Sequence, residues 1–273
     1  MPYFTTTDGA EIYYTDLGEG QPVILSHGWP LSSDAWQVEL KLLADNGYRA
    51  IAHDRRGHGK SSQPWQGNDM ETYARDLHEL VEYLDLHDLV VIGHSTGGGE
   101  VVKYAAQYGQ GRVVKVITAG AVPPIMVKSD TNPDGLPIEV FDGIRAGVAA
   151  DRSQFYEDLS VAFYGANRDG SKVSQGAKDD FWRQGMLVGL KAAYDCVKAF
   201  SETDFTENLK ALDVPILIAQ GDDDQIVPIM DAAEKSIHLV KHGTLKVYPG
   251  APHGIYGDYQ AALDKDILDF IKN

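Results

Sequence analysis

A serine stands between glycines at a point where the sequence changes from a strand pattern to a helix pattern. The apolar run Leu89-Val90-Val91-Ile92 stops at Gly93-His94-Ser95-Thr96-Gly97, and apolar residues at helical spacing follow. A sharp strand-to-helix turn of this Gly-x-Ser-x-Gly type projects the serine hydroxyl, and glycines avoid collisions with the neighbouring elements. The turn also places Ser95 at a helix N-terminus, which favours a developing negative charge. We therefore predict that Ser95 is a nucleophile; the alternative is a plain turn whose serine caps the helix.

A serine hydroxyl is almost wholly protonated near neutral pH, so it needs a base, and the base needs an orienting acid. Candidates for both follow predicted strands, because functional residues gather beyond the carboxyl ends of a parallel sheet. His253, in a glycine- and proline-bounded loop after the last predicted strand, is the predicted base. Of Asp222, Asp223 and Asp224, which follow an earlier strand, Asp224 is preferred over Asp222 as the acid. A solvated acidic turn and a loose calcium site are the alternatives for this triplet.

Acyl transfer through Ser95 also requires two backbone N–H groups that bind the oxyanion. One is predicted to be the N–H of Thr96, directly after the nucleophile, and the other lies in the loop His27-Gly28-Trp29-Pro30. Pro30 has no N–H, so we assign the second donor to Trp29. His27 could be taken for a second base, but we expect it to structure the loop, since an oxyanion loop needs a fixed geometry.

The elements that must position these residues predict an α/β fold. Two alternating runs around Asp8-Gly9 predict an antiparallel N-terminal hairpin, after which strand and helix patterns alternate. This order is typical of a mostly parallel central sheet with helices on both faces, the α/β-hydrolase arrangement. Further strands are predicted at residues 23–26, 48–53, 89–92, 113–119, 215–219 and 244–248. Helices are predicted after Asp34, which we expect to cap its helix, after Ser95, and at residues 72–85, 230–240 and 259–271.

The alternation of strands and helices breaks after Val122-Pro123-Pro124. Helical patterns without a clear strand follow at residues 138–149, 152–164, 175–186 and 190–200. We therefore predict an all-helical cap insertion at residues 125–208, and a core domain made of residues 1–124 and 209–273. The alternative is that long helices continue the main core.

Composition narrows the classes of partner. The 273 residues carry a formal net charge of −16, and no basic cluster is larger than Arg55-Arg56, which argues against nucleic acid and anionic membranes as partners. The same charge slows the approach of anionic substrates, so small neutral acyl compounds are preferred as substrates.

A single cysteine, Cys196, excludes an intrachain disulfide and a multi-thiolate metal site. The first residues lack the pattern of a signal peptide and no apolar run approaches the ~20 residues of a membrane span, so we expect a cytoplasmic protein.

Five motifs together carry a family resemblance. They are Ser-His-Gly-Trp-Pro (26–30), Asp-Arg-Arg-Gly-His-Gly-Lys-Ser (54–61), Gly-His-Ser-Thr-Gly-Gly-Gly-Glu (93–100), Gly-Asp-Asp-Asp-Gln-Ile-Val-Pro (221–228) and Ala-Pro-His-Gly (251–254). In this order they resemble the α/β-hydrolases called cofactor-free haloperoxidases, which include bacterial arylesterases and perhydrolases. The resemblance implies the triad Ser95–Asp224–His253, cleavage of small aryl or alkyl esters, and homo-oligomers. It also implies perhydrolysis, in which a carboxylic acid and hydrogen peroxide give a peracid that oxidises halide without haem, metal or flavin.

Two further expectations concern the second nucleophile and the acyl group. Pro30 favours an extended ψ at Trp29, and we hypothesise that the Trp29 carbonyl accepts a hydrogen bond from hydrogen peroxide, which competes with water. By analogy with the family, an apolar acyl pocket is expected to be lined by Val122, Met126, Ile144, Leu159, Phe163, Ile226 and Ile229. A lactonase or γ-lactamase with the same triad is the alternative function, and a non-catalytic ligand-binding protein of this fold is a second alternative.

Overall fold

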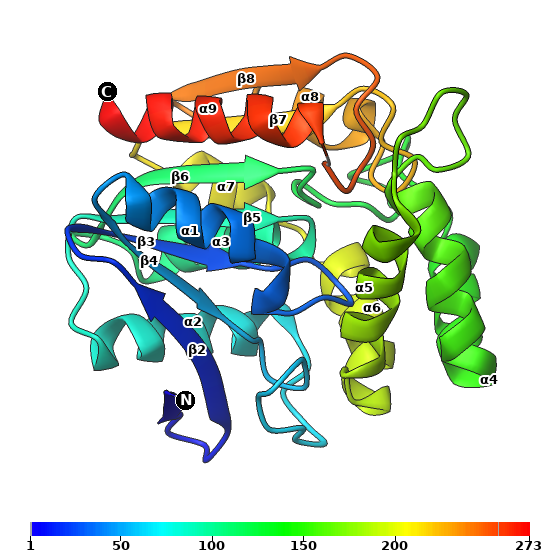
Figure 1. Ribbon diagram of the computed structural model, residues 1–273, viewed down its shortest axis with the longest axis horizontal. Coiled ribbons are helices and arrows are strands. Elements are labelled where there is room, and N and C mark those ends of the chain that lie inside the picture. The colour runs from blue at the N-terminus through cyan, green and yellow to red at the C-terminus, as the bar shows by residue number, and fades with distance from the viewer. Residues whose placement is uncertain (1, 256) are drawn as a thin grey trace.

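The structure, a computed structural model, describes residues 2–255 and 257–273. Within these residues the strands form one eight-stranded sheet of order β1-β2-β4-β3-β5-β6-β7-β8 (Figure 1). The β1–β2 and β2–β4 pairs are antiparallel and every other neighbouring pair is parallel, which confirms the predicted mixed sheet. The strands are β1 (Tyr3–Thr5), β2 (Glu11–Leu17), β3 (Gln21–Ser26), β4 (Tyr48–His53), β5 (Leu89–His94), β6 (Val113–Ala119), β7 (Ile216–Gly221) and β8 (Gly243–Tyr248).

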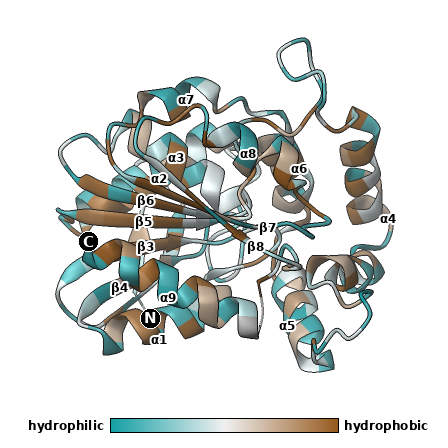
Figure 2. Ribbon diagram, turned by 90° about the horizontal axis from the view of Figure 1, so that it is seen from above, coloured by the Kyte–Doolittle hydropathy of each residue, from teal (hydrophilic) through white to brown (hydrophobic). Residues whose placement is uncertain are grey.

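Helices cover both faces of the sheet, as Figure 2 shows from above. Side chains alternate between the two faces of each strand. Val23 and Leu25 of β3 therefore join one apolar cluster, while Ile24 between them joins the other. The first cluster includes residues of α1 (Gln37–Asp45) and α9 (Asp258–Lys272). The second includes residues of α2 (Met70–Tyr83), α3 (Thr96–Gln107), α7 (Thr206–Ala211) and α8 (Ala233–Ser236).

Three helices between β6 and β7 in the chain lie beyond the carboxyl ends of the parallel strands (Figure 1). They are α4 (Ile138–Phe163), α5 (Gln175–Met186) and α6 (Leu190–Glu202). The backbone of α4 leaves helical geometry at Asp151, with φ −146° and ψ 83°, where the sequence predicts a break between two helices. The assignment of residues 125–208 to a separate cap stays a prediction, and α7, which begins before residue 208, packs against α3.

Two predicted details of the helices are wrong. Asp34 does not cap α1: a 3-10 helix, η1 (Ser33–Trp36), comes first, and the hydroxyl of Ser32 accepts the N–H of Asp34 at 3.3 Å. The predicted helix at residues 230–240 is broken into the 3-10 helix η2 (Ile229–Asp231) and the short α8. The break occurs because Ala232 is non-helical, and the N–H of Ala233 donates to the Gln220 side chain at 3.3 Å instead of continuing a helix.

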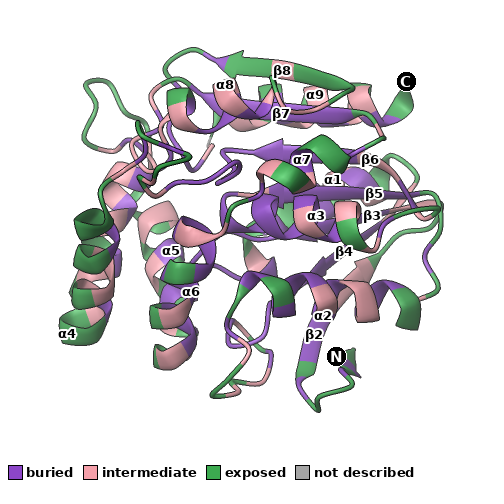
Figure 3. Cartoon of the chain, turned by 180° about the vertical axis from the view of Figure 1, so that it is seen from behind, coloured by how far each residue is buried: buried purple, intermediate pink, exposed green. Residues whose placement is uncertain are grey.

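The parallel strands at the centre are buried, whereas the outer turns of α4 and the edge strand β8 are exposed (Figure 3). In the part of the chain that the structure describes, no helix is both long and apolar enough to cross a membrane. The loops at the carboxyl ends of the parallel strands lie between the sheet and α4–α6 (Figure 1).

The α1–α9 face encloses a carboxyl group. Glu39 of α1 is 5% exposed, and its Oε1 accepts a hydrogen bond from Gln260 Nε2 of α9 at 2.9 Å. The other oxygen, Oε2, is buried without a partner among the described residues. Burial disfavours the charged form and raises the pKa of Glu39 to about 7.

We expect this group to make stability fall as the pH rises from about 4.5 to about 7. In that range the unfolded chain releases the Glu39 proton, whereas the folded protein keeps it. Glu39→Gln removes this titration, so the loss of unfolding free energy between pH 5 and pH 8 should shrink by roughly 2–3 kcal/mol. Urea denaturation at both pH values measures the effect, with Glu207→Gln as the control because the Glu207 side chain is 84% exposed. Equal pH dependence in the wild type and Glu39→Gln would contradict the assignment.

Candidate active site

Ser95 occupies the turn between β5 and α3 with φ +54° and ψ −120°, a conformation that non-glycine residues rarely adopt. The flanking glycines allow the turn to pack tightly. A Cβ on Gly93 would lie 2.2 Å from the Gly97 carbonyl oxygen, and one on Gly97 would lie 2.2 Å from the Ser26 carbonyl oxygen. The N–H of Ser95 donates to the carbonyl of Ala119 at 3.0 Å. The turn is therefore fixed between β3 and β6, with Ser95 at its apex.

The three consecutive aspartates after β7 have three different partners. Asp222 accepts a backbone N–H from the turn after β8, and Asp223 forms an ion pair with Arg168. Asp224 meets His253, with 2.7 Å between Oδ2 and the imidazole Nδ1. Among the residues that the structure describes, no group of three or more His, Cys, Asp or Glu side chains is arranged to hold a metal ion. The three carboxylates therefore do not form one uniform solvated turn, since each binds a different part of the structure.

The Asp224 carboxylate is oriented from both sides. Its Oδ1 accepts the backbone N–H groups of Ile226 and Val227 at 2.9 and 2.8 Å, which leaves Oδ2 to bind His253. A carboxylate accepts hydrogen bonds, so the proton of a neutral imidazole lies on Nδ1 and the lone pair on Nε2. This Nε2 atom is buried and has no hydrogen-bond partner in the described chain. The arrangement leaves a proton acceptor free at the site.

The end of β6 brings the Ser95 turn and the Asp224–His253 pair together. Gly120 follows the β6 residue that binds the N–H of Ser95, and a Cβ on Gly120 would lie 3.3 Å from His253 Nδ1 and 3.4 Å from Asp224 Oδ2. On the other side, His94 Nε2 lies 3.1 Å from the His253 carbonyl oxygen, with 4.8 Å between the ring centroids. His253 is therefore adjacent to His94, the residue before Ser95.

The two residues predicted to supply the oxyanion-binding N–H groups, Trp29 and Thr96, line one cavity together with Ser95. Thr96 is the first residue of α3, so its N–H has no partner inside the helix. Trp29 lies in the loop after β3, directly before Pro30, and its indole Nε1 donates to the Ala193 carbonyl of α6 at 3.1 Å. That hydrogen bond fixes the loop against the helices above it.

The ring of His27 makes contacts within the same loop. Its Nδ1 lies 2.8 Å from the Gly28 carbonyl oxygen, and its Nε2 accepts the backbone N–H of Arg55 at 3.0 Å. Burial, followed by the nearby charge of Arg55, lowers the pKa of His27 well below its usual range. A neutral ring with both nitrogens occupied holds the loop in place and has no atom free to act as a base.

An apolar cavity of about 60 Å³ opens at Ser95. Six of the seven residues predicted for an acyl pocket line it: Val122, Met126, Ile144, Leu159, Phe163 and Ile226. Ile229 is absent from the lining, because the chain turns into η2 at that residue, and Val227 takes its place. The lining residues that the sequence analysis missed are Leu136, Val140, Phe141, Phe200 and Val227. Helical spacing from Ile144 would have indicated Val140 and Phe141, since residues three and four apart share a helix face.

A buried ion network lies beneath the Ser95 turn and the loop of His27. Glu100 of α3 accepts hydrogen bonds from Arg55 Nε at 2.8 Å and Ser26 Oγ at 2.7 Å, and lies 2.8 Å from His53 Nε2. Arg55 Nη2 also donates to the His27 carbonyl at 2.8 Å. Burial alone would raise the pKa of Glu100, but the charge of Arg55 and the hydrogen bonds from His53 and Ser26 outweigh it and lower the pKa to about 2. The carboxylate is therefore ionised and fully paired.

We predict that Glu100→Gln is strongly destabilising, because it leaves the Arg55 charge buried without its counter-charge. Loss of one partner of a buried ion pair typically costs 3–5 kcal/mol, or roughly 6–15 °C in melting temperature for a chain of this size. Glu71→Gln is the control, since it breaks the Glu71–Lys103 pair at a site where the carboxylate is 55% exposed. Calorimetry should find less than about 1 kcal/mol for that control. Equal losses in the two variants would contradict the prediction.

Comparisons with known proteins place this geometry in context. Residues 21–258 match the model of the alpha/beta hydrolase fold family. The chain is 56% identical to a non-heme chloroperoxidase from Streptomyces lividans and 51% identical to a bifunctional esterase/perhydrolase from Acinetobacter calcoaceticus, each over the full length of both chains. The crystal structure of a bromoperoxidase from Bacillus anthracis is 38% identical, with a TM-score of 0.93 over 97% of this chain and 96% of that one.

Proposed function

This chain belongs to the alpha/beta hydrolase fold family, and on that basis we propose that it is a serine esterase of small carboxylic esters that also makes peracids by perhydrolysis. One observation carries the proposal: His253 binds Asp224 through Nδ1 and keeps Nε2 free, beside the strained turn that presents Ser95. A nucleophile, a base and an orienting acid are the parts that acyl transfer requires. The names of the relatives support both reactions.

The first half of the reaction forms an acyl-enzyme. Ser95 Oγ attacks the ester carbonyl carbon while His253 Nε2 takes the hydroxyl proton. Asp224 holds the imidazole in the required tautomer and stabilises the imidazolium that forms. The oxyanion of the tetrahedral intermediate accepts hydrogen bonds from the N–H groups of Thr96 and Trp29. When the intermediate collapses, His253 protonates the departing alcohol and the acyl group stays on Ser95.

The second half releases the acyl group to another nucleophile. His253 takes a proton from water, the resulting oxygen nucleophile attacks the acyl carbon, and the bond to Ser95 breaks as its oxygen regains a proton. With hydrogen peroxide in place of water the product is a peracid. When a carboxylic acid supplies the acyl group, acid and peroxide give peracid and water overall. In this proposal the Trp29 carbonyl, set by Pro30, accepts a hydrogen bond from the peroxide. The released peracid then oxidises bromide or chloride in solution.

The cavity at Ser95 supports short, neutral acyl groups as substrates. It holds about 60 Å³ and is lined mainly by aliphatic and aromatic side chains. The net charge of −16 disfavours the approach of anions, although carboxylic acids at high concentration can still react. Nothing in this proposal calls for nucleic acid or a membrane as partner. The homo-oligomer implied by the resemblance and a cytoplasmic location stay predictions.

Ser95→Ala tests the nucleophile directly. We expect loss of at least about 10⁴-fold in the rate of p-nitrophenyl acetate hydrolysis, because no other group can form the acyl-enzyme. Peracetic acid formation from acetate and hydrogen peroxide should disappear with it. Circular dichroism and melting temperature of the variant serve as folding controls. Undiminished hydrolysis by a folded Ser95→Ala protein would remove the basis of the proposal.

Pro30→Leu tests the positioning of peroxide. Leucine releases the restriction on ψ of Trp29, so the Trp29 carbonyl should bind hydrogen peroxide less well. We expect the ratio of perhydrolysis to hydrolysis to fall about three- to tenfold, the equivalent of roughly one weakened hydrogen bond. Both rates are measured on one preparation, so that losses in active protein cancel in the ratio. An unchanged ratio would show that Pro30 has no such role.

A further inference from the structure

Both sequence neighbours of Asp224 are held by the turn that follows α4. Arg168 forms a bidentate pair with Asp223, with 2.7 Å between Nε and Oδ2 and 2.6 Å between Nη2 and Oδ1. Asn167 and Gln225 exchange amide hydrogen bonds in both directions, at 2.9 and 3.0 Å. Arg168 and Asp223 lie 55 positions apart in the chain, and Asn167 and Gln225 lie 58 positions apart. Side-chain hydrogen bonds before and after Asp224 therefore join its loop to the turn that follows α4.

Both sequence neighbours of His253 contact the same segment. The N–H of Gly254 donates to the carbonyl of Phe163, the last residue of α4, at 2.7 Å. Pro252 packs on Gly165, where an added Cβ would lie 3.1 Å from the proline Cβ. The ring of Phe163 also meets the His253 ring edge-on, with centroids 5.0 Å apart. Residues on each side of the base are thus fixed by the end of α4 and the turn beyond it.

We propose that residues 163–168 form a brace that positions the Asp224–His253 pair, a role that rests on the proposed serine-hydrolase function. Asp224 and His253 come from separate loops, after β7 and after β8, and β8 is the exposed edge strand of the sheet. A third element that binds both loops reduces their freedom to move apart. The residues of the brace are positioning residues, because their polar groups bind the neighbours of the pair and not the pair itself.

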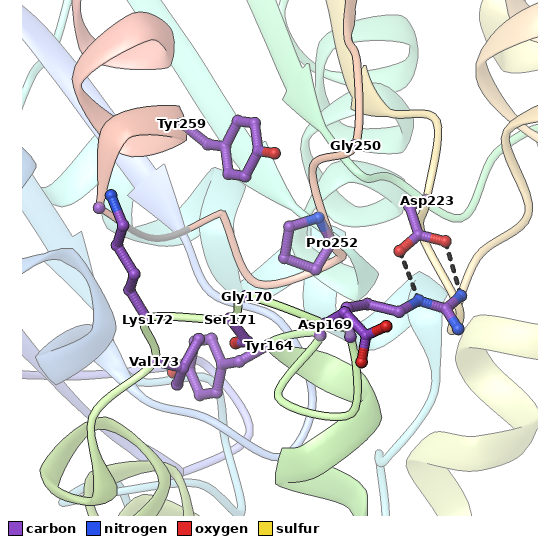
Figure 4. A pocket seen from close by; sticks show the side chains of 13 residues that line it. Tyr164, Asp169, Gly170, Ser171, Lys172, Val173, Asp223, Gly250, Pro252 and Tyr259 are labelled. Carbon is purple, nitrogen blue, oxygen red and sulfur yellow. Dashed lines mark hydrogen bonds and ion pairs between the residues drawn. The ribbon is translucent and has the colours of Figure 1, made fainter.

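The outer side of the brace faces a hollow of about 410 Å³, drawn in Figure 4. Tyr164, Asp223, Pro252 and Tyr259 line it, and the dashed lines mark the ion pair of Asp223. The Arg168 and Asp223 side chains are 50% and 32% exposed, so removing one of them leaves no charge buried without a partner. Substitutions in the brace should therefore change little in overall stability. Function and folding can be measured separately here.

The inner side of the brace touches the proposed acyl site. Phe163 contacts His253 with its ring, binds Gly254 through its carbonyl and also lines the cavity at Ser95. The brace thus begins at the acyl cavity and ends at the surface ion pair. An acyl group that packs against Phe163 contacts the same element that holds the base in place.

The test compares the double variant Asn167→Ala/Arg168→Gln with Arg183→Gln. Arg183 is a matched control: it is 47% exposed, carries the same charge and joins α5 to Asp34 at 3.0 Å, and in the described part of the chain its ion pairs are with Asp34 and Asp180, outside both triad loops. For p-nitrophenyl acetate we expect kcat of the double variant to fall roughly tenfold, since sub-ångström misplacement of a catalytic group is costly. KM should stay within about twofold, because neither Asn167 nor Arg168 lines the acyl cavity.

A pH profile separates positioning from a merely structural role. If the Asp224 contact is looser, the imidazolium of His253 is stabilised less, and the acidic limb of kcat/KM moves to lower pH. A structural defect that only reduces the amount of folded protein leaves this limb in place. Arg168→Lys keeps the charge but cannot form the bidentate contact, so with Asn167 intact it should give an intermediate shift.

The outcomes distinguish the brace from the proposed function. A tenfold lower kcat with a shifted acidic limb in the double variant, and neither change in Arg183→Gln, supports the brace. A double variant with wild-type kcat, or one whose limb does not move, overturns the brace alone, provided that Ser95→Ala is inactive in the same assay. If Ser95→Ala is active, the proposed function fails, and the brace with it.

Discussion

The charged pair of Glu100 and Arg55 is the constraint on which the positions of the active-site loops depend. Both side chains are at most 1% exposed, and each would be very costly to bury alone. Their hydrogen bonds to Ser26, His27 and His53 join the ends of β3 and β4 to α3 at Glu100. The loop that carries His27 and Trp29 and the Ser95 turn therefore cannot shift independently without leaving a charge unpaired.

Strand order then determines which loops can meet. β6 lies between β5, which ends at the Ser95 turn, and β7, which precedes Asp224. The residues where β6 ends contact both sides: Ala119 accepts the N–H of Ser95, and Gly120 leaves room for the ring of His253. A side chain at position 120 would compete for space with the Asp224–His253 pair. The carboxyl ends of parallel strands converge, which explains why residues so distant in sequence form one site.

The helices beyond the sheet have two roles at this site. Their apolar side chains form the cavity at Ser95, and the end of α4 together with the turn beyond it binds the loops of Asp224 and His253. Phe163 takes part in both, since it lines the cavity and contacts His253. If residues 163–168 brace the pair as we propose, changes in this helical region alter the cavity at Ser95 and the Asp224–His253 geometry together.

The sequence by itself determined the local features: the bounds of β4 and β6, the N-terminal hairpin at Asp8-Gly9, and the Ser95 turn between a strand and a helix. These depend on short-range periodicity and on glycine conformation, which neighbouring residues encode. Only the tertiary structure decided what each of three adjacent aspartates binds, why Val227 and not Ile229 reaches the cavity, and where the helix predicted at 230–240 breaks. Those outcomes depend on partners such as Arg168, His253 and Gln220 that other strands and loops bring into contact, and no local pattern records such pairings.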